Sequence, residues 1–340
     1  MEFKDYIALN RTKVHSKINE YLSMKGPAEY SRIVREYSDR QGKYVRPGLL
    51  LLCGEMFGAK IKDLILPAAA MQLSEDWILM HDDVEDDSDT RRGKPAIQKI
   101  YGPEQAINAG DAAHMAMWKI LEDYIATNGI PRGIKLFDRF YKILNMTVEG
   151  QYLDIKFTRE TRQIGMATEK MYFDIISRKT SCYSVYGPMQ LGAIVANQRE
   201  GVMKALKEIG SPAGIAFQIV DDVLDVTASE KEFGKQRYGD LYEGKLTLIM
   251  LHAYGEATRA EKLKVDRIYK KDRRNKTKDE IDFLVYLIEK YGSTDYAYKL
   301  AMKYGEESQS AIEKYGIVLP NNEYRELFVS AVTTLFLRKK

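Results

Sequence analysis

Apolar residues recur every three or four positions along almost the whole chain. One such pattern runs from Ile7 to Leu22, and another runs from Ile281 to Ile288 and is ended by Gly292. This spacing places the apolar side chains on one face of an α-helix, and the alternation that is typical of strands is rare. The stretch "GAIVAN" at 192–197 fits either pattern, but it lies inside a longer apolar helical window. The sequence therefore predicts an all-α fold.

The composition excludes several classes of protein. Hydrophobic residues make up 45% of the 340 residues, enough for a sizeable core, and the net charge of +3 is too small to indicate a nucleic-acid partner. Cys53 and Cys182 are the only cysteines, so no disulfide framework is expected. The N-terminus is charged, unlike a signal peptide, and no apolar run is long enough to span a membrane. We therefore expect a cytoplasmic protein, and the length alone allows one domain or two.

An acidic cluster directly follows the apolar run 77–80. The stretch "HDDVEDDSDTRRGKPA" begins at position 81 and holds six acidic side chains between positions 82 and 89. A second stretch, "FQIVDDVLDVT" at 217–227, repeats its pattern, since both contain D-D-V-x-D. The aspartates are Asp82, Asp83 and Asp86 in the first motif, and Asp221, Asp222 and Asp225 in the second.

The spacing within each motif favours a metal site. The first and last aspartates are four residues apart, so both lie on one face of a helix, where like charges repel. An unpaired carboxylate in an apolar window is costly, but a bound cation would reverse that effect, and carboxylate oxygens suit Mg²⁺. One copy alone is often only a solvated acidic helix face; two copies beside apolar helix favour metal. An EF-hand is excluded because the first motif lacks the required glycine, and the scattered histidines do not predict zinc.

Basic residues accompany both motifs. Any one of them alone is more often a solvated surface charge, but lysine and arginine together with Mg²⁺ suit a diphosphate group. The polar run "YKKDRRNKTKDE" at 269–280 is instead interpreted as a solvated loop. The basic residues near the motifs are Lys43, Arg46, Arg91, Arg92, Lys179, Lys235 and Lys245.

Taken together, these motifs resemble those of the trans-isoprenyl diphosphate synthase (polyprenyl synthetase) family, closest to its short-chain geranylgeranyl and farnesyl types. The two aspartate motifs resemble the family's two aspartate-rich motifs, and "GKYVRP", "GQYLDI", "RKTS" and "GKQRYGDLYEGKLT" match its other signatures in order. The resemblance covers roughly residues 15–340. It implies that residues 1–340 form a single all-helical domain, a bundle around a central cavity, which acts as a homodimer.

The resemblance also implies a reaction and a set of roles. A magnesium-dependent enzyme would condense isopentenyl diphosphate with an allylic diphosphate, with about three Mg²⁺ ions held by the six aspartates. Thr180 and Gln218 would face the carbocation with neutral oxygens. The allylic diphosphate would be held by Arg91, Lys179, Lys235 and Lys245, and isopentenyl diphosphate by Lys43, Arg46 and Arg92, with Arg338, Lys339 and Lys340 closing over it.

Two departures from the family pattern affect the isopentenyl diphosphate side. Glu75 occupies a position where the family usually has histidine, and an acid there would repel a diphosphate unless it pairs with Lys43 or Arg46. Tyr44 stands where the family often has arginine.

Product length is expected to depend on residues just before the first motif. The resemblance points to Trp77 as the floor of the cavity, while Ile78 and Ser74 offer no second barrier. This combination favours geranylgeranyl diphosphate (C20), with farnesyl diphosphate (C15) or a longer product as alternatives. A terpene cyclase and a non-catalytic regulatory subunit are alternatives of another class, and the presence of both aspartate motifs argues against each.

Overall fold

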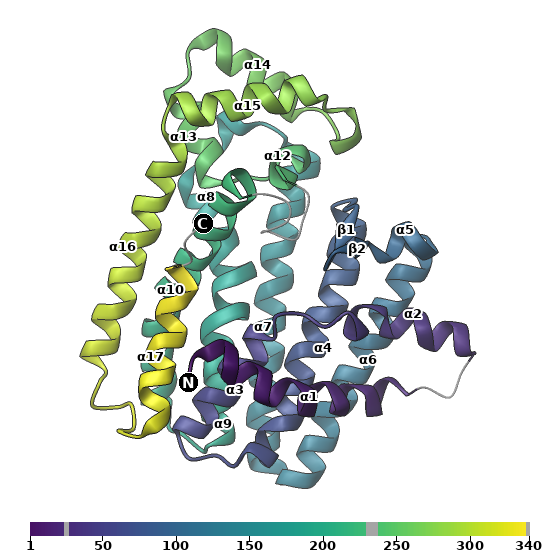
Figure 1. Cartoon of the computed structure of the whole chain (residues 1–340), viewed down its shortest axis with the longest axis vertical. Helices are drawn as coiled ribbons and strands as arrows, with labels where there is room; N and C mark the ends of the chain where they lie inside the picture. Colours follow the sequence, from purple (N-terminus) through teal and green to yellow (C-terminus); the bar gives the residue numbers. More distant parts are fainter. Residues whose placement is uncertain (24–26, 229–236, 338–340) are drawn as a thin grey trace.

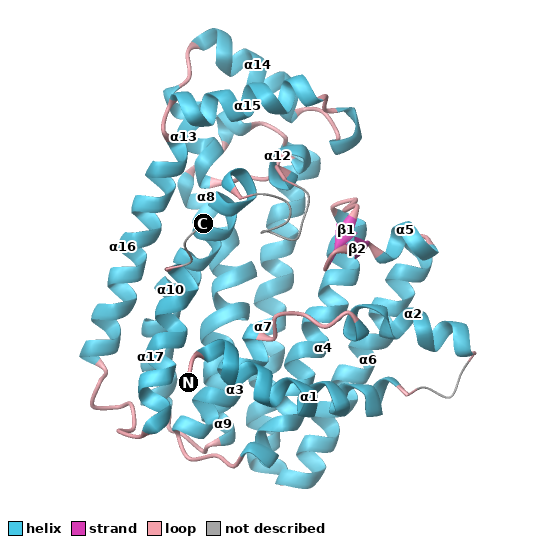
Figure 2. Ribbon diagram, in the orientation of Figure 1, coloured by secondary structure: helices cyan, strands magenta, loops and turns pink. Residues whose placement is uncertain are grey.

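The structure is a computed structural model that describes residues 1–23, 27–228 and 237–337. It is helical almost throughout, which confirms the all-α prediction (Figures 1 and 2). The first half contains α1 (Phe3–Leu22), α2 (Ala28–Asp39), α3 (Val45–Met56), α4 (Ile61–Glu85), α5 (Ile97–Tyr101), α6 (Pro103–Asn128) and α7 (Ile130–Ile155).

The second half contains further α-helices and several shorter turns of π- or 3₁₀-helix. The elements are η1 (Lys156–Thr161), η2 (Ile164–Met166), α8 (Glu169–Ile176), η3 (Ser177–Tyr186), α9 (Gly187–Val195), α10 (Glu200–Thr227), α12 (Gly239–Glu243), α13 (Leu248–Glu256), α14 (Arg259–Tyr269), η4 (Arg273–Asn275), α15 (Lys278–Lys290), α16 (Ser293–Lys314) and α17 (Glu323–Phe336). The ambiguous stretch 192–197 belongs largely to α9, so its helical interpretation is confirmed.

A small antiparallel hairpin interrupts the helices directly after the first aspartate motif. Its strands are β1 (Thr90–Arg91) and β2 (Lys94–Pro95), drawn in magenta in Figure 2, and Gly93 has a positive φ of 73° in the turn between them. Glycine adopts this backbone conformation without steric cost. The hairpin was not predicted from the sequence. It turns the chain back immediately after α4 and thereby places Arg91 beside the acidic end of that helix.

The two helices that carry the aspartate motifs lie in the middle of the bundle. Helix α4 packs against α3 and α6, and α10 packs against α16 and η3. Gly150 of α7 allows η3 to approach closely, since a Cβ there would lie 2.5 Å from the backbone nitrogen of Lys179. The apolar faces of these helices form one continuous buried core. Within the described ranges, no helix combines the length and apolar character that a membrane span needs.

The basic run at 269–280 differs from its predicted state. It does connect two helices, α14 and α15, which lie across one end of the bundle (top of Figure 1). It is not fully solvated, however, because the Arg273 side chain is 10% exposed and Lys276 is 6% exposed. The interpretation of this run as a solvated loop was therefore wrong for these two residues, since both find acceptors on α12.

Candidate active site

A cavity of about 790 Å³ lies between the two aspartate motifs. Helices α4, α7, η3, α10 and α12 all contribute to its wall. The predicted site residues that line it are Lys43, Arg46, Glu75, Trp77, Ile78, Asp82, Asp86, Arg91, Arg92, Lys179, Thr180, Gln218, Asp221, Asp222, Asp225 and Lys245. Asp83 and Ser74 do not line it. Lys235, Arg338, Lys339 and Lys340 lie outside the described residues.

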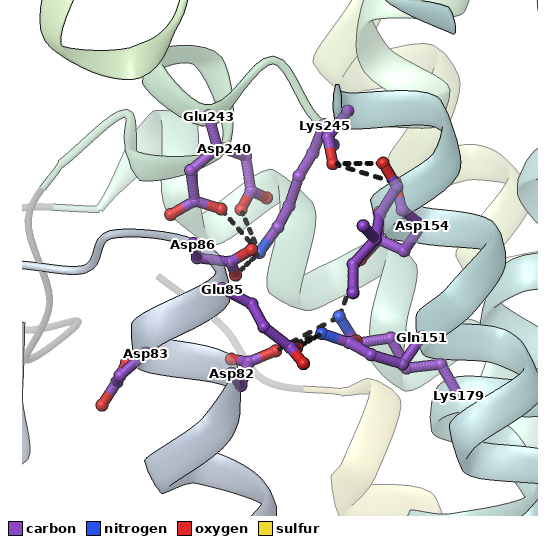
Figure 3. A network of polar contacts seen from close by, with 12 residues as sticks. Asp82, Asp83, Glu85, Asp86, Gln151, Asp154, Lys179, Asp240, Glu243 and Lys245 are labelled. Atoms are coloured by element: carbon purple, nitrogen blue, oxygen red, sulfur yellow. Dashed lines mark hydrogen bonds and ion pairs between the residues drawn. The ribbon is translucent and has the colours of Figure 1, made fainter. Parts of the chain in front are cut away.

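Lys179 connects the first motif to helix α7 across the cavity. Its ammonium nitrogen lies 2.7 Å from an Asp154 carboxylate oxygen and 3.5 Å from one of Asp82 (Figure 3). The Gln151 side-chain amide donates to both Asp82, at 3.2 Å, and Glu85, at 2.6 Å. Burial works to lower the pKa of Lys179, but Asp154 and Asp82 outweigh it and raise this pKa. Lys179 therefore carries its charge at neutral pH.

On the α12 side of the cavity, Lys245 pairs with acidic side chains as Lys179 does on the α7 side (Figure 3). Its ammonium nitrogen lies 2.7 Å from Glu243, 3.1 Å from Asp86 and 3.8 Å from Asp240. Burial opposes the charged form, yet these three acids raise the pKa of Lys245 well above its ordinary value. Burial raises the pKa of Asp86 to about 8, although Lys245 works in the opposite direction. The cluster holds more acid than one ammonium group can compensate.

Asp83 has different surroundings from the other two aspartates of its motif. It is fully buried and accepts hydrogen bonds from Arg91 Nε at 3.0 Å and from the Tyr37 hydroxyl at 2.5 Å. Its side chain points away from the network around Lys245 (Figure 3). Successive helical residues are rotated by about 100°, so Asp83 cannot face the cavity together with Asp82. The sequence predicted a metal ligand here, whereas the geometry shows an ion pair that anchors Arg91.

In the second motif, neutral groups donate hydrogen bonds to Asp222 and Asp225. Asp222 accepts hydrogen bonds from the Tyr172 hydroxyl at 2.8 Å and from the Gln218 amide at 2.7 Å. The backbone N–H of Asp240 donates to Asp225 at 3.2 Å. Burial, followed by the charge of Asp240, raises the pKa of Asp222 well above its ordinary value.

Thr180 and Gln218 lie together beside the second motif. The Thr180 hydroxyl donates to the Gln218 side-chain oxygen at 2.7 Å, and both residues line the cavity. Neither oxygen carries a formal charge. Such oxygens stabilise positive charge without forming a bond to it.

The predicted isopentenyl diphosphate side is rich in ion pairs. Glu75 lies 3.0 Å from Arg46 and 3.8 Å from Arg92, and Arg92 lies 2.9 Å from the buried Asp76. The Arg46 guanidinium also lies over the Tyr183 ring, 4.6 Å from its centroid. The acid at position 75 therefore orients two arginines.

Trp77 forms part of the apolar end of the cavity. It is 7% exposed and stacks on His114 of α6, with 4.3 Å between the ring centroids. His114 in turn accepts a hydrogen bond from the Trp118 indole N–H at 2.8 Å. Ser74 is fully buried and its hydroxyl lies 3.0 Å from that of Tyr183, so it lies behind the cavity wall.

Several functional candidates had no role in the sequence analysis. Gln151 and Asp154 belong to "GQYLDI", and Asp240 and Glu243 belong to "GKQRYGDLYEGKLT", so their motifs were noted but their individual contacts were not. Tyr37, Tyr172 and Arg273 had no sequence signal, because each acts through a contact between distant segments.

The donor set fits hard divalent cations. Carboxylate oxygens of Asp82, Asp86, Asp221, Asp222 and Asp225 line one cavity, and such oxygens are the ligands that Mg²⁺ prefers. Among residues 1–23, 27–228 and 237–337, no three acidic, histidine or cysteine side chains lie close enough together to enclose one ion. Lys179 and Lys245 lie beside these carboxylates instead.

Comparisons with known proteins agree with this geometry. The family model described as "Polyprenyl synthetase" matches residues 27–287. A geranylgeranyl diphosphate synthase of Methanosarcina mazei is 34% identical, with 92% of each chain covered. A geranylfarnesyl diphosphate synthase of Natronomonas pharaonis is 30% identical over 94% of this chain and 93% of its own.

Solved structures show the same fold. The geranylgeranyl pyrophosphate synthetase of Pyrococcus horikoshii superposes with a TM-score of 0.85 at 31% identity, covering 99% of this chain and 98% of its own. A geranylgeranyl pyrophosphate synthase of Corynebacterium glutamicum, solved with isoprenyl diphosphate and magnesium, has a TM-score of 0.88 at 20% identity over the full length of both chains.

Proposed function

Because this chain belongs to the polyprenyl synthetase family of trans-prenyltransferases, we propose that it condenses isopentenyl diphosphate with an allylic diphosphate. The proposed product is a short-chain all-trans prenyl diphosphate, namely geranylgeranyl diphosphate. The observation that carries this proposal is the cavity in which two aspartate motifs face each other with Lys179 and Lys245 beside them. The relatives named above support it.

The acidic residues would hold Mg²⁺, about three ions in all. When bound, Mg²⁺ would supply positive charge that stabilises the diphosphate leaving group as its negative charge develops. The residues proposed to hold it are Asp82, Asp86, Asp221, Asp222 and Asp225, whereas Asp83 would act by anchoring Arg91.

The cationic side chains would bind the allylic diphosphate. Lys179 and Lys245 now pair with acids, and they would exchange these partners for diphosphate oxygens. Arg91, which lines the cavity, would contribute a fixed guanidinium group, and Lys235 would add a further cation. These charges stabilise the diphosphate anion as the bond between C1 and oxygen breaks.

The apolar wall and the neutral oxygens would protect the allylic cation. Thr180 and Gln218 would face it, and exclusion of water prevents its capture as an alcohol. The double bond of isopentenyl diphosphate, held by Lys43, Arg46 and Arg92, forms the new carbon–carbon bond at C1. The resulting cation then loses a proton to the released diphosphate, which restores a double bond.

Trp77 would set the product length. Its ring lines the cavity and stacks on His114, and this rigid position supports a C20 product. The bulk of tryptophan makes C15 the alternative, and the geranylfarnesyl relative makes a longer product the other. Trp77→Ala should give products of C25 or longer, measured by chromatography of the dephosphorylated alcohols. An unchanged product, or a wild-type product of C30 or longer, would contradict Trp77 as the floor.

An exposed apolar face supports a homodimer. Ile134, Tyr141 and Val148 lie seven residues apart on α7 and are each at least 50% exposed, and Met115 on α6 is 60% exposed. Large exposed apolar faces of this kind commonly mark association surfaces. We propose that the chain acts as a single-domain subunit of a cytoplasmic homodimer, which sedimentation analysis of the purified protein would test.

One experiment separates the proposed reaction from its alternatives. Purified protein is incubated with Mg²⁺, labelled isopentenyl diphosphate and dimethylallyl, geranyl or farnesyl diphosphate. Incorporation of label into longer allylic diphosphates is expected. Release of a cyclic hydrocarbon without incorporation would indicate a terpene cyclase. No product from any primer would indicate a regulatory subunit.

A further inference from the structure

The basic run between α14 and α15 reaches the wall of the active-site cavity. Two neighbouring arginines in it have opposite environments, since the side chain of Arg273 is 10% exposed and that of Arg274 is 76% exposed. Arg273 lines the cavity, whereas Arg274 does not and pairs with Asp87 at the surface. The burial of Arg273 but not of Arg274 indicates that Arg273 has a specific function.

Arg273 holds the acid that competes for Lys245. Its Nη1 lies 2.6 Å from one Glu243 carboxylate oxygen, and the other oxygen of Glu243 lies 2.7 Å from Lys245. Glu243 therefore connects the arginine with the lysine. The Glu243 side chain is only 11% exposed, so water compensates little of its charge.

Lys276 fixes the backbone of the same turn. Its ammonium nitrogen donates to the carbonyl oxygens of Leu241, at 2.9 Å, and Tyr242, at 2.8 Å, in the last turn of α12. Gly244 follows with a positive φ of 76°. The run at 273–276 thus holds both the Glu243 side chain and the backbone that leads to Lys245.

Arg273 and Lys245 both pair with Glu243, and this determines how strongly Glu243 binds Lys245. A buried carboxylate attracts every nearby cation strongly, because little water screens it. With Arg273 present, Glu243 divides its charge between two cations. Without it, Glu243 would bind Lys245 alone and more tightly, so a diphosphate would compete less well for the lysine.

We propose that Arg273 is a positioning residue that neutralises Glu243 and thereby lets Lys245 bind the allylic diphosphate. This inference rests on the proposed function, because it concerns the same substrate site. Arg273 acts through Glu243 and not by contact with the substrate.

The first test is the variant Arg273→Gln, with Arg274→Gln as matched control. The KM for the allylic diphosphate should rise about tenfold in Arg273→Gln, the size expected for a weakened charged hydrogen bond. The KM for isopentenyl diphosphate should not change, and Arg274→Gln should match the wild type in both constants. Equal rises in both KM values, or no rise, would overturn the proposal.

A binding measurement keeps the test independent of turnover. Titration of the protein with inorganic diphosphate in the presence of Mg²⁺, followed by calorimetry, should show weaker binding in Arg273→Gln and partial recovery in Arg273→Lys. If the wild type binds diphosphate and has no prenyltransferase activity, the proposed function fails and this inference with it. If the wild type is active and all variants bind diphosphate equally, only this inference fails.

A double-mutant cycle tests whether Arg273 acts through Glu243. In the Glu243→Gln background, Arg273→Gln should cause no further loss of diphosphate affinity, because the competing acid is absent. The same tenfold loss in both backgrounds would mean that Arg273 contacts the diphosphate itself, and this would overturn the positioning role. Thermal melting of each variant confirms that the folded protein is compared.

Discussion

The two aspartate motifs share a pattern, but their middle aspartates, Asp83 and Asp222, are held by different kinds of group. At the end of α4, Asp82, Asp83 and Asp86 each contact a cationic side chain, namely Lys179, Arg91 or Lys245. At the end of α10, Asp222 instead accepts hydrogen bonds from a tyrosine hydroxyl and an amide. The middle aspartate of the first motif is therefore stabilised by an ion pair before any ligand binds, whereas the middle aspartate of the second is held by dipoles. This difference predicts that matched substitutions in the two motifs have equal effects on catalysis and opposite effects on stability.

The largest expected effect is on turnover. Asp82→Ala and Asp221→Ala should each lower kcat by about 10²- to 10³-fold or more, because an electrostatic group at a reacting centre contributes roughly 2.7–4 kcal/mol. The fold should persist, as judged by circular dichroism. A rate near that of the wild type at saturating Mg²⁺ in either variant would contradict the shared role of the two motifs.

The stabilities of the middle aspartates should respond in opposite directions. Asp83→Asn removes the nearer of the two ion-pair partners of the buried Arg91, leaving Asp82 at 3.4 Å, and should lower the free energy of unfolding by about 3 kcal/mol. Asp222→Asn removes a buried carboxylate whose neutral form is already favoured, so it should change the stability little or raise it by about 1 kcal/mol. Urea unfolding in the presence of a chelator measures both. Equal losses in the two variants would remove the distinction between the motifs.

The contributions of the two regions to stability should also depend on pH in opposite ways. Hydrogen bonding to Arg274 lowers the pKa of Asp87, next to the first motif, to about 2. Asp87 therefore stabilises the fold at pH values above its unfolded pKa of about 4, and this stabilisation is lost as the pH falls toward 2. The raised pKa of Asp222 has the opposite effect on stability. The contribution of Asp222 to the free energy of unfolding is complete below about pH 4 and is lost as the pH rises through the folded pKa.

The measurement is the melting temperature as a function of pH. The stability advantage of Asp222→Asn over the wild type should grow between pH 4 and pH 7. Arg274→Gln should instead lose stability relative to the wild type above pH 4 and match it near pH 2. Differences that do not vary with pH would show that these carboxyl groups do not titrate differently in the folded and unfolded chains.

The smallest effects should come from two matched hydroxyl deletions. Tyr37→Phe removes one donor from Asp83, which keeps Arg91, and also the acceptor of the Ile97 backbone N–H, and should cost about 1–2 kcal/mol. Tyr172→Phe leaves Asp222 with the Gln218 amide, and protonation can relieve that carboxyl, so its cost in urea unfolding should be smaller than that of Tyr37→Phe under the same conditions. An equal or larger cost for Tyr172→Phe would contradict this relief by protonation.

The sequence predicted those parts of the site that depend on local spacing. The four-residue separation of Asp82 and Asp86 requires that both lie on one helix face, and both do line the cavity. The helical class followed from periodicity in the same way. The partners Tyr37 and Tyr172 could not be predicted, because each hydroxyl reaches an aspartate that is 46 or 50 residues away in sequence.

Composition misled the interpretation of the run at 269–280 for a related reason. A cluster of lysine and arginine is usually solvated, and Arg274 follows that rule. Arg273 and Lys276 do not, because α12 presents a carboxylate and two carbonyl oxygens at the point where the run passes. Such acceptors are placed by tertiary packing, and no property of the run itself reveals them.

The π-helical segment η3 has a consequence for insertions and deletions. It carries Lys179 and Thr180 into the cavity, and it is enclosed by Gly150 and Gly214, where an added Cβ would lie 2.5 Å and 2.6 Å from its backbone. Loss of one residue from 177–186 would let ordinary α-helix form, but every side chain before the deletion would rotate by about 100° relative to those after it. Lys179 and Thr180 could then not face the cavity while the following helix kept its packing. The number of residues in this segment is therefore as tightly constrained as their identity, and shortened variants should fold yet fail to bind diphosphate.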